Sequence, residues 1–179
     1  MSQVGSVYGQ ALYGLARDEN LSDKVLQELT TLEQSFQEEP QFLRLLSASN
    51  VPVEERCGIL DDCFRGKVHQ YVLNFLKILT EKGTVKAFSD CVRAYREQYN
   101  EDNHILPVTA VTAAALSEEQ VNRLAEKLSA ITGKKAQIIN RVDPACLGGV
   151  RLDYDGKRVD GSVANRLESV RKMLKNTVL

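Results

Sequence analysis

Apolar residues recur at helical spacing through the first hundred positions of the chain. Over 4–17 they share one arc, made of Val4, Val7, Tyr8, Ala11, Leu12 and Leu15 and extended by Gly5, Gly9 and Ala16. Further stripes predict a helix over 22–37 and a short helix after Pro40. Another helix is opened by Asn50 and Pro52 and runs to Phe64. The last two helices are expected over 69–82 and from Phe88 to Tyr99. These six segments together predict a helical bundle.

Two of these helices carry more apolar surface than one core contact requires. In 4–17 the arc of apolar and small residues spans roughly 220°, and its glycines lower helix propensity, so we expect another helix to approach them closely. In 69–82 one stripe holds Val72, Phe75, Leu76 and Leu79, and a neighbouring face holds Tyr71, Asn74 and Ile78. These second faces predict either a binding surface or a further contact inside the bundle, and the pattern alone leaves both open.

The periodicity changes after the polar stretch 100–103. Residues 105–113 are rich in valine, threonine and alanine and predict a strand. The capping box 117–120 opens a helix that runs to Thr132, Gly133 stops it, and 136–142 returns as a strand. The pattern predicts an α+β protein: an N-terminal six-helix bundle over 1–103, then a small C-terminal α/β domain over 104–179.

The stretch 147–162 organises this second domain. Gly148 and Gly149 permit a bend or a close backbone contact, and apolar residues then alternate with polar ones through 150–155 as in a half-buried strand. The dipeptide at 155–156 is a tight-turn signal, and 157–159 returns as a second strand. Asp160, Gly161 and Ser162 offer helix caps. A closing helix follows, with apolar residues Val163, Leu167, Val170 and Leu174.

Composition restricts the class of protein. The 179 residues are 43% hydrophobic and 26% charged, which is typical of a globular chain. With 23 basic and 24 acidic residues the net charge is −1, so no broad field favours nucleic acid. No apolar run reaches the ~20 residues of a spanning helix, and the start lacks a secretory signal or transit peptide, as we expect of a bacterial cytoplasmic protein.

Catalytic and metal-binding patterns are weak. The four cysteines form no C-x-x-C pair, and we expect free thiols. Gly148-Gly149 precedes a strand and lies in no phosphate-loop motif. Asp153, Asp155 and Asp160 could indicate a calcium site. However, the glycine does not stand at the position that it has in an EF-hand calcium loop, and no glutamate follows at the last position of that loop. We therefore expect no catalytic residue, metal or cofactor. A small α+β ligand-binding domain that uses these three aspartates is the alternative.

Three stretches of the sequence resemble one family. The run Val142-Asp143-Pro144, Leu147-Gly148-Gly149-Val150, Val159-Asp160-Gly161-Ser162-Val163 and Arg166-Leu167 is similar to the C-terminal signature of the ATP synthase delta subunit, related to the mitochondrial oligomycin-sensitivity-conferring protein. Tyr8-Gly9-Gln10-Ala11-Leu12 with Ala16 resembles the family's N-terminal pattern, with glycine where alanine is usual. The segment 74–79 with Gly83 resembles its N-F-L-x-L-L-x-x-x-G-R segment, although Thr84 replaces the arginine.

The resemblance implies a non-catalytic stator subunit, which links the catalytic head of the F-type ATP synthase to its peripheral stalk. It implies a single copy in a hetero-oligomeric complex, held peripherally at the cytoplasmic face of the cell membrane without insertion into it.

The resemblance also implies where the partners bind. A groove between the first and fifth helices would receive the N-terminal helix of an alpha subunit, with Tyr8, Ala11, Leu15, Asn74 and Ile78 as groove positions. The second domain would hold the C-terminal ends of the b subunits. The signature residues Asp143, Gly148, Gly149, Asp160, Gly161 and Ser162 would shape the fold. A soluble adaptor that binds another peptide helix in the same groove is the remaining alternative.

Overall fold

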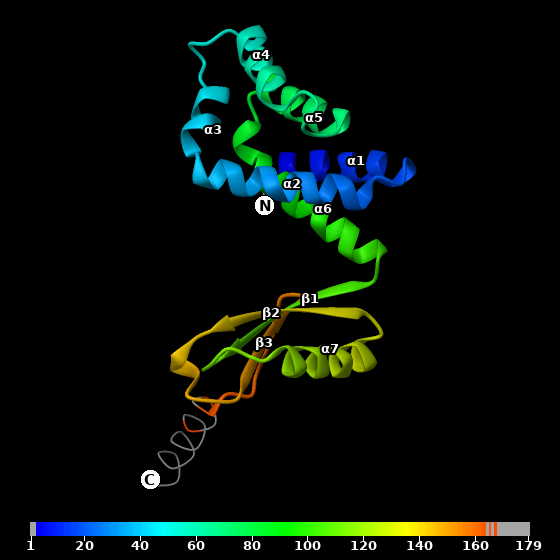
Figure 1. The fold of residues 1–179 in the computed structure, drawn as a ribbon, viewed down its shortest axis with the longest axis vertical. Coiled ribbons are helices and arrows are strands. Elements are labelled where there is room, and N and C mark those ends of the chain that lie inside the picture. The colour runs from blue at the N-terminus through cyan, green and yellow to red at the C-terminus, as the bar shows by residue number, and fades with distance from the viewer. Residues whose placement is uncertain (1–2, 164, 166, 168–179) are drawn as a thin grey trace. The chain divides into compact units, whose positions relative to one another are not determined.

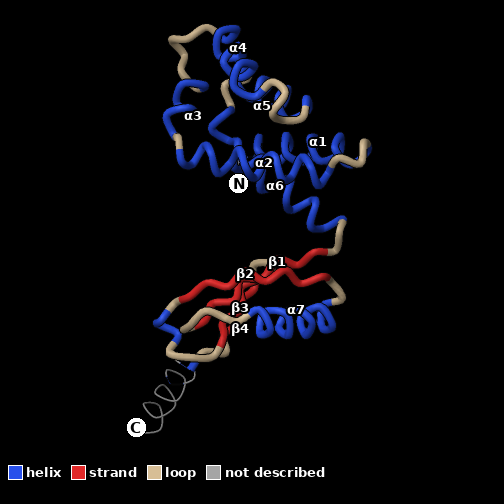
Figure 2. The backbone as a smooth tube through the Cα atoms, in the orientation of Figure 1, coloured by secondary structure: helices blue, strands red, loops and turns tan. Residues whose placement is uncertain are grey.

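The computed structural model describes residues 3–163 together with residues 165 and 167. The chain divides into two compact units, Met1–Tyr99 and Asn100–Leu179, which we describe separately (Figure 1). The first is helical and the second is built on a four-stranded sheet, as the colouring of Figure 2 makes clear. The predicted α+β class is therefore confirmed.

The first unit is formed by successive short helices. These are α1 (Gln3–Asp18), α2 (Ser22–Glu38), α3 (Pro40–Leu46), α4 (Val53–Phe64), α5 (Gln70–Glu81), the 3-10 helix η1 (Val85–Ala87) and α6 (Phe88–Asp102). The 3-10 helix was not predicted. It follows Gly83, whose φ of +66° ends the preceding helix in the left-handed conformation that glycine adopts without a Cβ penalty.

One hydrophobic core joins all six α-helices of this unit. Val25 and Leu29 of α2, Val72 and Leu76 of α5, and Phe88 of α6 belong to it and are almost completely buried. The predicted inner stripe of the fifth helix is confirmed, since its four residues are each at most 6% exposed. Because every helix contributes to one core, the short helices stabilise one another by shared burial rather than by their own propensity.

α1 packs through the small-residue side of its predicted arc. Its buried residues are Gly5, Gly9, Leu12 and Ala16 of that arc together with Tyr13, whereas Val4, Val7 and Leu15 of the arc are exposed. A Cβ placed on Gly9 would lie 2.3 Å from the Cys91 carbonyl oxygen of α6, so the expected close approach of another helix is confirmed. The Tyr13 ring, which the sequence pattern did not assign to the core, makes an edge contact with Tyr95 at 5.3 Å between centroids.

The start of α4 differs from the prediction. Asn50 does not cap this helix: Pro52 occupies the N-cap position, without a side-chain hydrogen bond. The turn is held instead by Arg56, which is 7% exposed and donates to the carbonyl oxygens of Leu46 (2.7 Å) and Val51 (3.1 Å). A guanidinium carries five N–H donors on a long side chain, so the one Arg56 side chain reaches both carbonyls.

The second unit is a βαβ unit followed by a hairpin. Its elements are β1 (Ile105–Thr112), α7 (Glu118–Thr132), β2 (Lys135–Val142), the 3-10 helix η2 (Pro144–Cys146), β3 (Val150–Tyr154) and β4 (Lys157–Asp160). The strand order is β2-β1-β3-β4, with β1 parallel to β2 and the other pairs antiparallel. A helix returns the chain between the parallel strands, whereas a tight turn suffices between β3 and β4.

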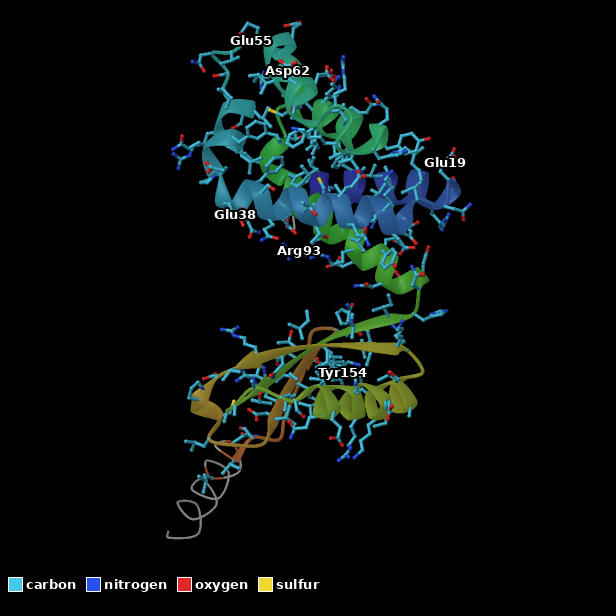
Figure 3. The ribbon with its side chains drawn as sticks, viewed as in Figure 1. Glu19, Glu38, Glu55, Asp62, Arg93 and Tyr154 are labelled. Atoms are coloured by element: carbon cyan, nitrogen blue, oxygen red, sulfur yellow. The ribbon has the colours of Figure 1, made fainter. Side chains whose placement is uncertain are left out.

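α7 covers one face of this sheet. Its predicted capping box is present: the Ser117 hydroxyl accepts from the Gln120 N–H, and the Gln120 side chain accepts from the Ser117 N–H. Its Ala125 and Leu128 pack against a small core of Leu106, Val108 and Ala136. Tyr154 of β3 packs on the same core (Figure 3).

The predicted closing helix is described only in its first turn. Val163, Asn165 and Leu167 are helical, whereas Val170 and Leu174 lie outside the described residues, as does Arg166 of the resemblance. Among the described residues, no helix is both long and apolar enough to cross a membrane.

Candidate partner-binding surfaces

The face of α1 beside its glycine side is apolar and exposed. Val4, Tyr8, Ala11 and Leu15 are spaced at four, three and four residues, which places them on one stripe. Leu15 is 54% exposed, Ala11 is exposed, and Tyr8 is half-buried against the core. A helix that already buries one face on its own unit and still presents leucine and valine to solvent has a surface suited to another helix.

α5 presents a matching second face. Ile78 is 41% exposed, Asn74 is exposed, and Tyr71 is half-buried against the same core as Tyr8. The His69 side chain caps the helix by accepting from the Tyr71 N–H, and the two rings make an edge contact. Of the second cluster predicted for this helix, Asn74 and Ile78 are thus exposed, whereas Tyr71 packs in part on the core of the first unit.

The two stripes belong to neighbouring helices, because α1 and α5 contact each other. All five sequence-predicted groove residues lie on these two stripes: Tyr8, Ala11, Leu15, Asn74 and Ile78. Asn74 accepts a hydrogen bond from Gln70 at 3.0 Å within its own helix, which orients its amide beside the apolar residues. We call these five residues together with Val4 and Tyr71 the α1–α5 surface. It offers apolar area with amide and phenol groups, which suits helix recognition and not acid–base catalysis.

An ion pair joins α5 to α4. Lys77 contacts Asp61 of α4 at 2.7 Å, and Arg65 adds a contact to the same carboxylate at 3.4 Å. The hydrogen bond from Lys77 is the main cause that holds the pKa of Asp61 below its ordinary value. These charges help to hold α4 and α5 together.

The C-terminal signature residues lie where the turn before β3 meets the end of β4. Asp143 caps η2 by accepting from the Ala145 N–H at 3.0 Å. Gly148 and Gly149 have φ of +154° and +75°, and a Cβ on Gly149 would lie 2.6 Å from the Gly161 carbonyl oxygen. The Gly161 N–H donates to the Val150 carbonyl at 3.0 Å. Glycine is therefore required sterically where the start of β3 meets the end of β4.

Asp160 and Ser162 complete this junction. The Ser162 hydroxyl accepts from the Asn165 N–H at 3.2 Å, so it caps the closing helix, and Ser162 is only 3% exposed. Hydrogen bonds from the Ser162 side chain and backbone, with the charges of Arg151 and Arg158, hold the pKa of Asp160 below its ordinary value. Four of the six predicted signature residues contact one another: Gly149 lies against Gly161 and Ser162, and Asp160 binds Ser162. The other two, Asp143 and Gly148, bond to Ala145 and Val163 on either side of the turn that leads into β3.

The three aspartates of the alternative hypothesis do not converge. Asp153 is paired with Arg158 at 2.7 Å, Asp155 lies in the hairpin turn with φ of +48°, and Asp160 is bound at the junction. A hollow of about 600 Å³ beside the turn is lined by Pro107, Thr109, Asp153, Tyr154, Asp155, Gly156, Lys157 and Arg158. Within the described residues, no group of three or more histidine, cysteine or acidic side chains is placed to hold a metal ion.

Comparison with known proteins gives the family. The sequence model of the ATP synthase delta (OSCP) subunit matches residues 4–174. The chain belongs to this family. The ATP synthase delta subunit of Alkaliphilus oremlandii is 32% identical over 96% of this chain and 95% of its own length. That of Lactobacillus gasseri is 33% identical over 96% and 94%, respectively. A chain of the Toxoplasma gondii mitochondrial ATP synthase hexamer has the same fold, with a TM-score of 0.75 at 19% identity over 97% of this chain and 98% of that one.

Membership settles the class of function. The delta (OSCP) family is a structural, non-catalytic part of the F-type ATP synthase, and the predicted stator role in the peripheral stalk is confirmed. The chain therefore works as part of a membrane-associated complex, and it is not an enzyme. The alternative of a free ligand-binding domain is wrong.

Proposed function

We propose that this subunit joins the head of the synthase to the stalk through its two units. The α1–α5 surface would bind the N-terminal helix of an alpha subunit, and the second unit would hold the C-terminal ends of the b subunits. The observation that carries the proposal is the exposed apolar stripe on two adjoining helices, with Leu15 54% and Ile78 41% exposed. One copy would work in each complex, at the cytoplasmic face of the cell membrane.

Each residue of the α1–α5 surface has a role in this proposal. Leu15 and Ile78 would supply apolar area, and Tyr8 would add ring area with a polar tip. Ala11 lies in the middle of the α1 stripe, where its small side chain gives a partner helix clearance. Asn74, already oriented by Gln70, would use its amide N–H groups toward the partner.

We further propose that residues 1–103 fold alone as a six-helix bundle. All six helices contribute to one core, and the compact unit ends at Tyr99, with α6 continuing to Asp102. The residues needed to close the hydrophobic core are therefore present in the fragment.

The test of the head contact is Ala11→Asp. Ala11 is exposed, so the variant should fold, but on binding its carboxylate would be desolvated without a partner. That burial costs several kcal/mol, so binding of the alpha-subunit N-terminal peptide should weaken by roughly a hundredfold or more. The matched control is Gln10→Asp, which places the same charge on an exposed position of α1 off the stripe.

Calorimetry with the peptide and thermal melting should be run on the same samples. The proposal expects both variants to melt like the wild type and only Ala11→Asp to lose affinity. A folded Ala11→Asp variant with wild-type affinity would remove this surface from the contact. Co-purification with membranes that carry the synthase separates the stator from a soluble adaptor that uses the same surface.

A further inference from the structure

An Asp-Gly dipeptide lies at each end of strand β4. Asp155-Gly156 forms the turn that leads from β3 into β4, and Asp160-Gly161 follows where β4 ends. The sequence contains no other Asp-Gly pair and no Asn-Gly pair. Glycine has no Cβ to keep its amide nitrogen away from the carboxyl carbon of the residue before it. An aspartate followed by glycine is therefore the place where a backbone rearranges most readily.

The Asp155-Gly156 turn is open to solvent and lies outside the strand ladder. Both residues are exposed and have positive φ, +48° and +68°, as in a type I′ hairpin turn. The last residue pair of the ladder is Tyr154 with Lys157, so the two turn residues take no part in it. A Cβ built on Gly156 would meet nothing within 4 Å. The Gly156 nitrogen and the Asp155 carboxyl carbon are thus free to approach each other, and water has access to both.

The Asp160-Gly161 pair is held by hydrogen bonds. The Gly161 N–H donates to the Val150 carbonyl oxygen at 3.0 Å, and a Cβ on Gly161 would lie 3.2 Å from that same oxygen. The Asp160 carboxylate accepts from the Ser162 N–H at 2.9 Å. Both the nitrogen that would attack and the carboxyl group that would be attacked are engaged elsewhere. The fold therefore presents the same dipeptide once free and once restrained.

We propose that Asp155 is a site of spontaneous isomerisation to isoaspartate, and that the fold protects Asp160 from the same reaction. The inference is independent of the proposed function, because it rests on the β3–β4 hairpin alone. It assigns a covalent modification to a turn whose carboxylates otherwise suggest only a solvated surface.

The reaction consumes no reagent other than water. The Gly156 nitrogen gives up its proton and bonds to the side-chain carboxyl carbon of Asp155, whose C–OH bond breaks, so that water leaves and a succinimide ring closes. Water then adds to one of the two ring carbonyls and breaks its bond to nitrogen. Opening at the side-chain carbonyl restores aspartate, whereas opening at the main-chain carbonyl gives isoaspartate. The product has the same mass and oxidation state as the starting chain.

The product would change the hairpin. In isoaspartate the main chain passes through Cβ, so the turn gains a backbone atom, and the length of the turn fixes the register of a hairpin. The pair after Tyr154 and Lys157 is Asp153 with Arg158, which are joined at 2.7 Å. Isomerisation at Asp155 should therefore loosen this ion pair and the end of the β3–β4 hairpin, and it should lower the melting temperature.

Ageing of the folded protein tests the site. The full-length chain should be kept for several weeks at body temperature and mildly acidic pH and then digested. Electron-transfer fragmentation of the peptides distinguishes isoaspartate from aspartate. The net effect of one hydrogen bond corresponds to roughly tenfold, and Asp160-Gly161 is restrained by the bonds of Gly161 and Ser162, so position 155 should exceed position 160 by about tenfold or more. In urea the two positions should react at similar rates.

Two variants of the turn serve as controls. Asp155→Asn keeps a dipeptide that favours the same turn type, and it should form isoaspartate faster, because ammonia leaves an amide more readily than water leaves a carboxyl group. Asp155→Glu should form none at this position, because its ring would be one atom larger, and should react as before at Asp160. When the samples are aged in parallel, the wild type should lose melting temperature and Asp155→Glu should keep its own.

The outcomes decide the inference. An excess of isoaspartate at position 155 that disappears in urea supports it. Equal amounts at the two positions of the folded protein, or none at 155, overturn it. If Asp155→Asn reacts no faster than the wild type, the turn keeps the Gly156 nitrogen from the side-chain carbon and the inference is wrong.

Discussion

Substitution of Gly9 by alanine tests the packing that leaves the α1 stripe exposed. In an exposed helix position, glycine to alanine stabilises by up to about 1 kcal/mol, because alanine loses less backbone entropy. At Gly9 the added methyl would lie 2.3 Å from the Cys91 carbonyl oxygen and 2.8 Å from the Ala94 Cβ. Both belong to α6, and the nearer atom is backbone, so α1 must move away from α6.

The expected magnitude follows from two opposing terms. Overpacking of a close contact costs about 1–3 kcal/mol, and a backbone obstacle favours the upper part of that range. After subtraction of the propensity gain, Gly9→Ala should lose roughly 1–2 kcal/mol of the free energy of unfolding. Gly14→Ala, in the same helix, meets no other atom within 4 Å and should gain up to about 1 kcal/mol.

The two variants should therefore shift in opposite directions and differ by about 1–3 kcal/mol in the free energy of unfolding. Each kcal/mol moves the melting temperature of a domain of this size by about 4–8 °C, so the two midpoints should differ by roughly 4–24 °C. Circular dichroism melts and urea titrations of the two variants measure this difference, and an unchanged urea slope shows that only stability has changed. If Gly9→Ala stabilises the protein as much as Gly14→Ala does, the close approach of α1 and α6 is wrong.

Two further predictions concern thiols and domains. Burial raises the pKa of the Cys91 thiol to about 11, with the nearby Asp90 carboxylate as a second cause. In the folded protein at pH 8, Ellman's reagent should therefore modify the half-buried Cys57 and Cys63. It should leave the buried Cys91 and Cys146 unmodified until urea is added. Rapid labelling of Cys91 in the native state would contradict its placement in the core. A fragment of residues 1–103 should melt cooperatively with a helical spectrum, and a broad transition without a baseline would show that the first unit needs the second to fold.

The helices of the first unit could be predicted well from the sequence, because each carries apolar residues at a spacing that brings them to one face only in a helix. The stripe in α5 is the clearest case, with Val72, Phe75, Leu76 and Leu79 all buried. The sequence predicts α1 less accurately, because the buried side consists mainly of glycine and alanine, which carry little hydrophobic signal. The residues with the stronger signal, Val4 and Leu15, are the ones that remain exposed.

Other features depend on contacts that no local pattern encodes. Arg56 closes the turn between α3 and α4 by reaching carbonyls ten and five residues away, and an arginine in a helix usually indicates only a solvated surface. Tyr95 likewise hydrogen-bonds to the Ser22 carbonyl across the first unit. The α1–α5 surface could be predicted as a set of residues, but its exposure follows only from which side of each helix the core uses.

The C-terminal signature shows why a motif can identify a family without identifying a contact. Gly149 is fixed by a backbone atom closer than a Cβ permits, Gly161 by a tight approach of the Val150 carbonyl oxygen, and Ser162 by the helix that it caps. Such constraints act on the fold of the subunit itself, so they hold whatever partner binds. A Gly149 variant would therefore lose stability first, and any loss of stalk binding would be secondary to misfolding.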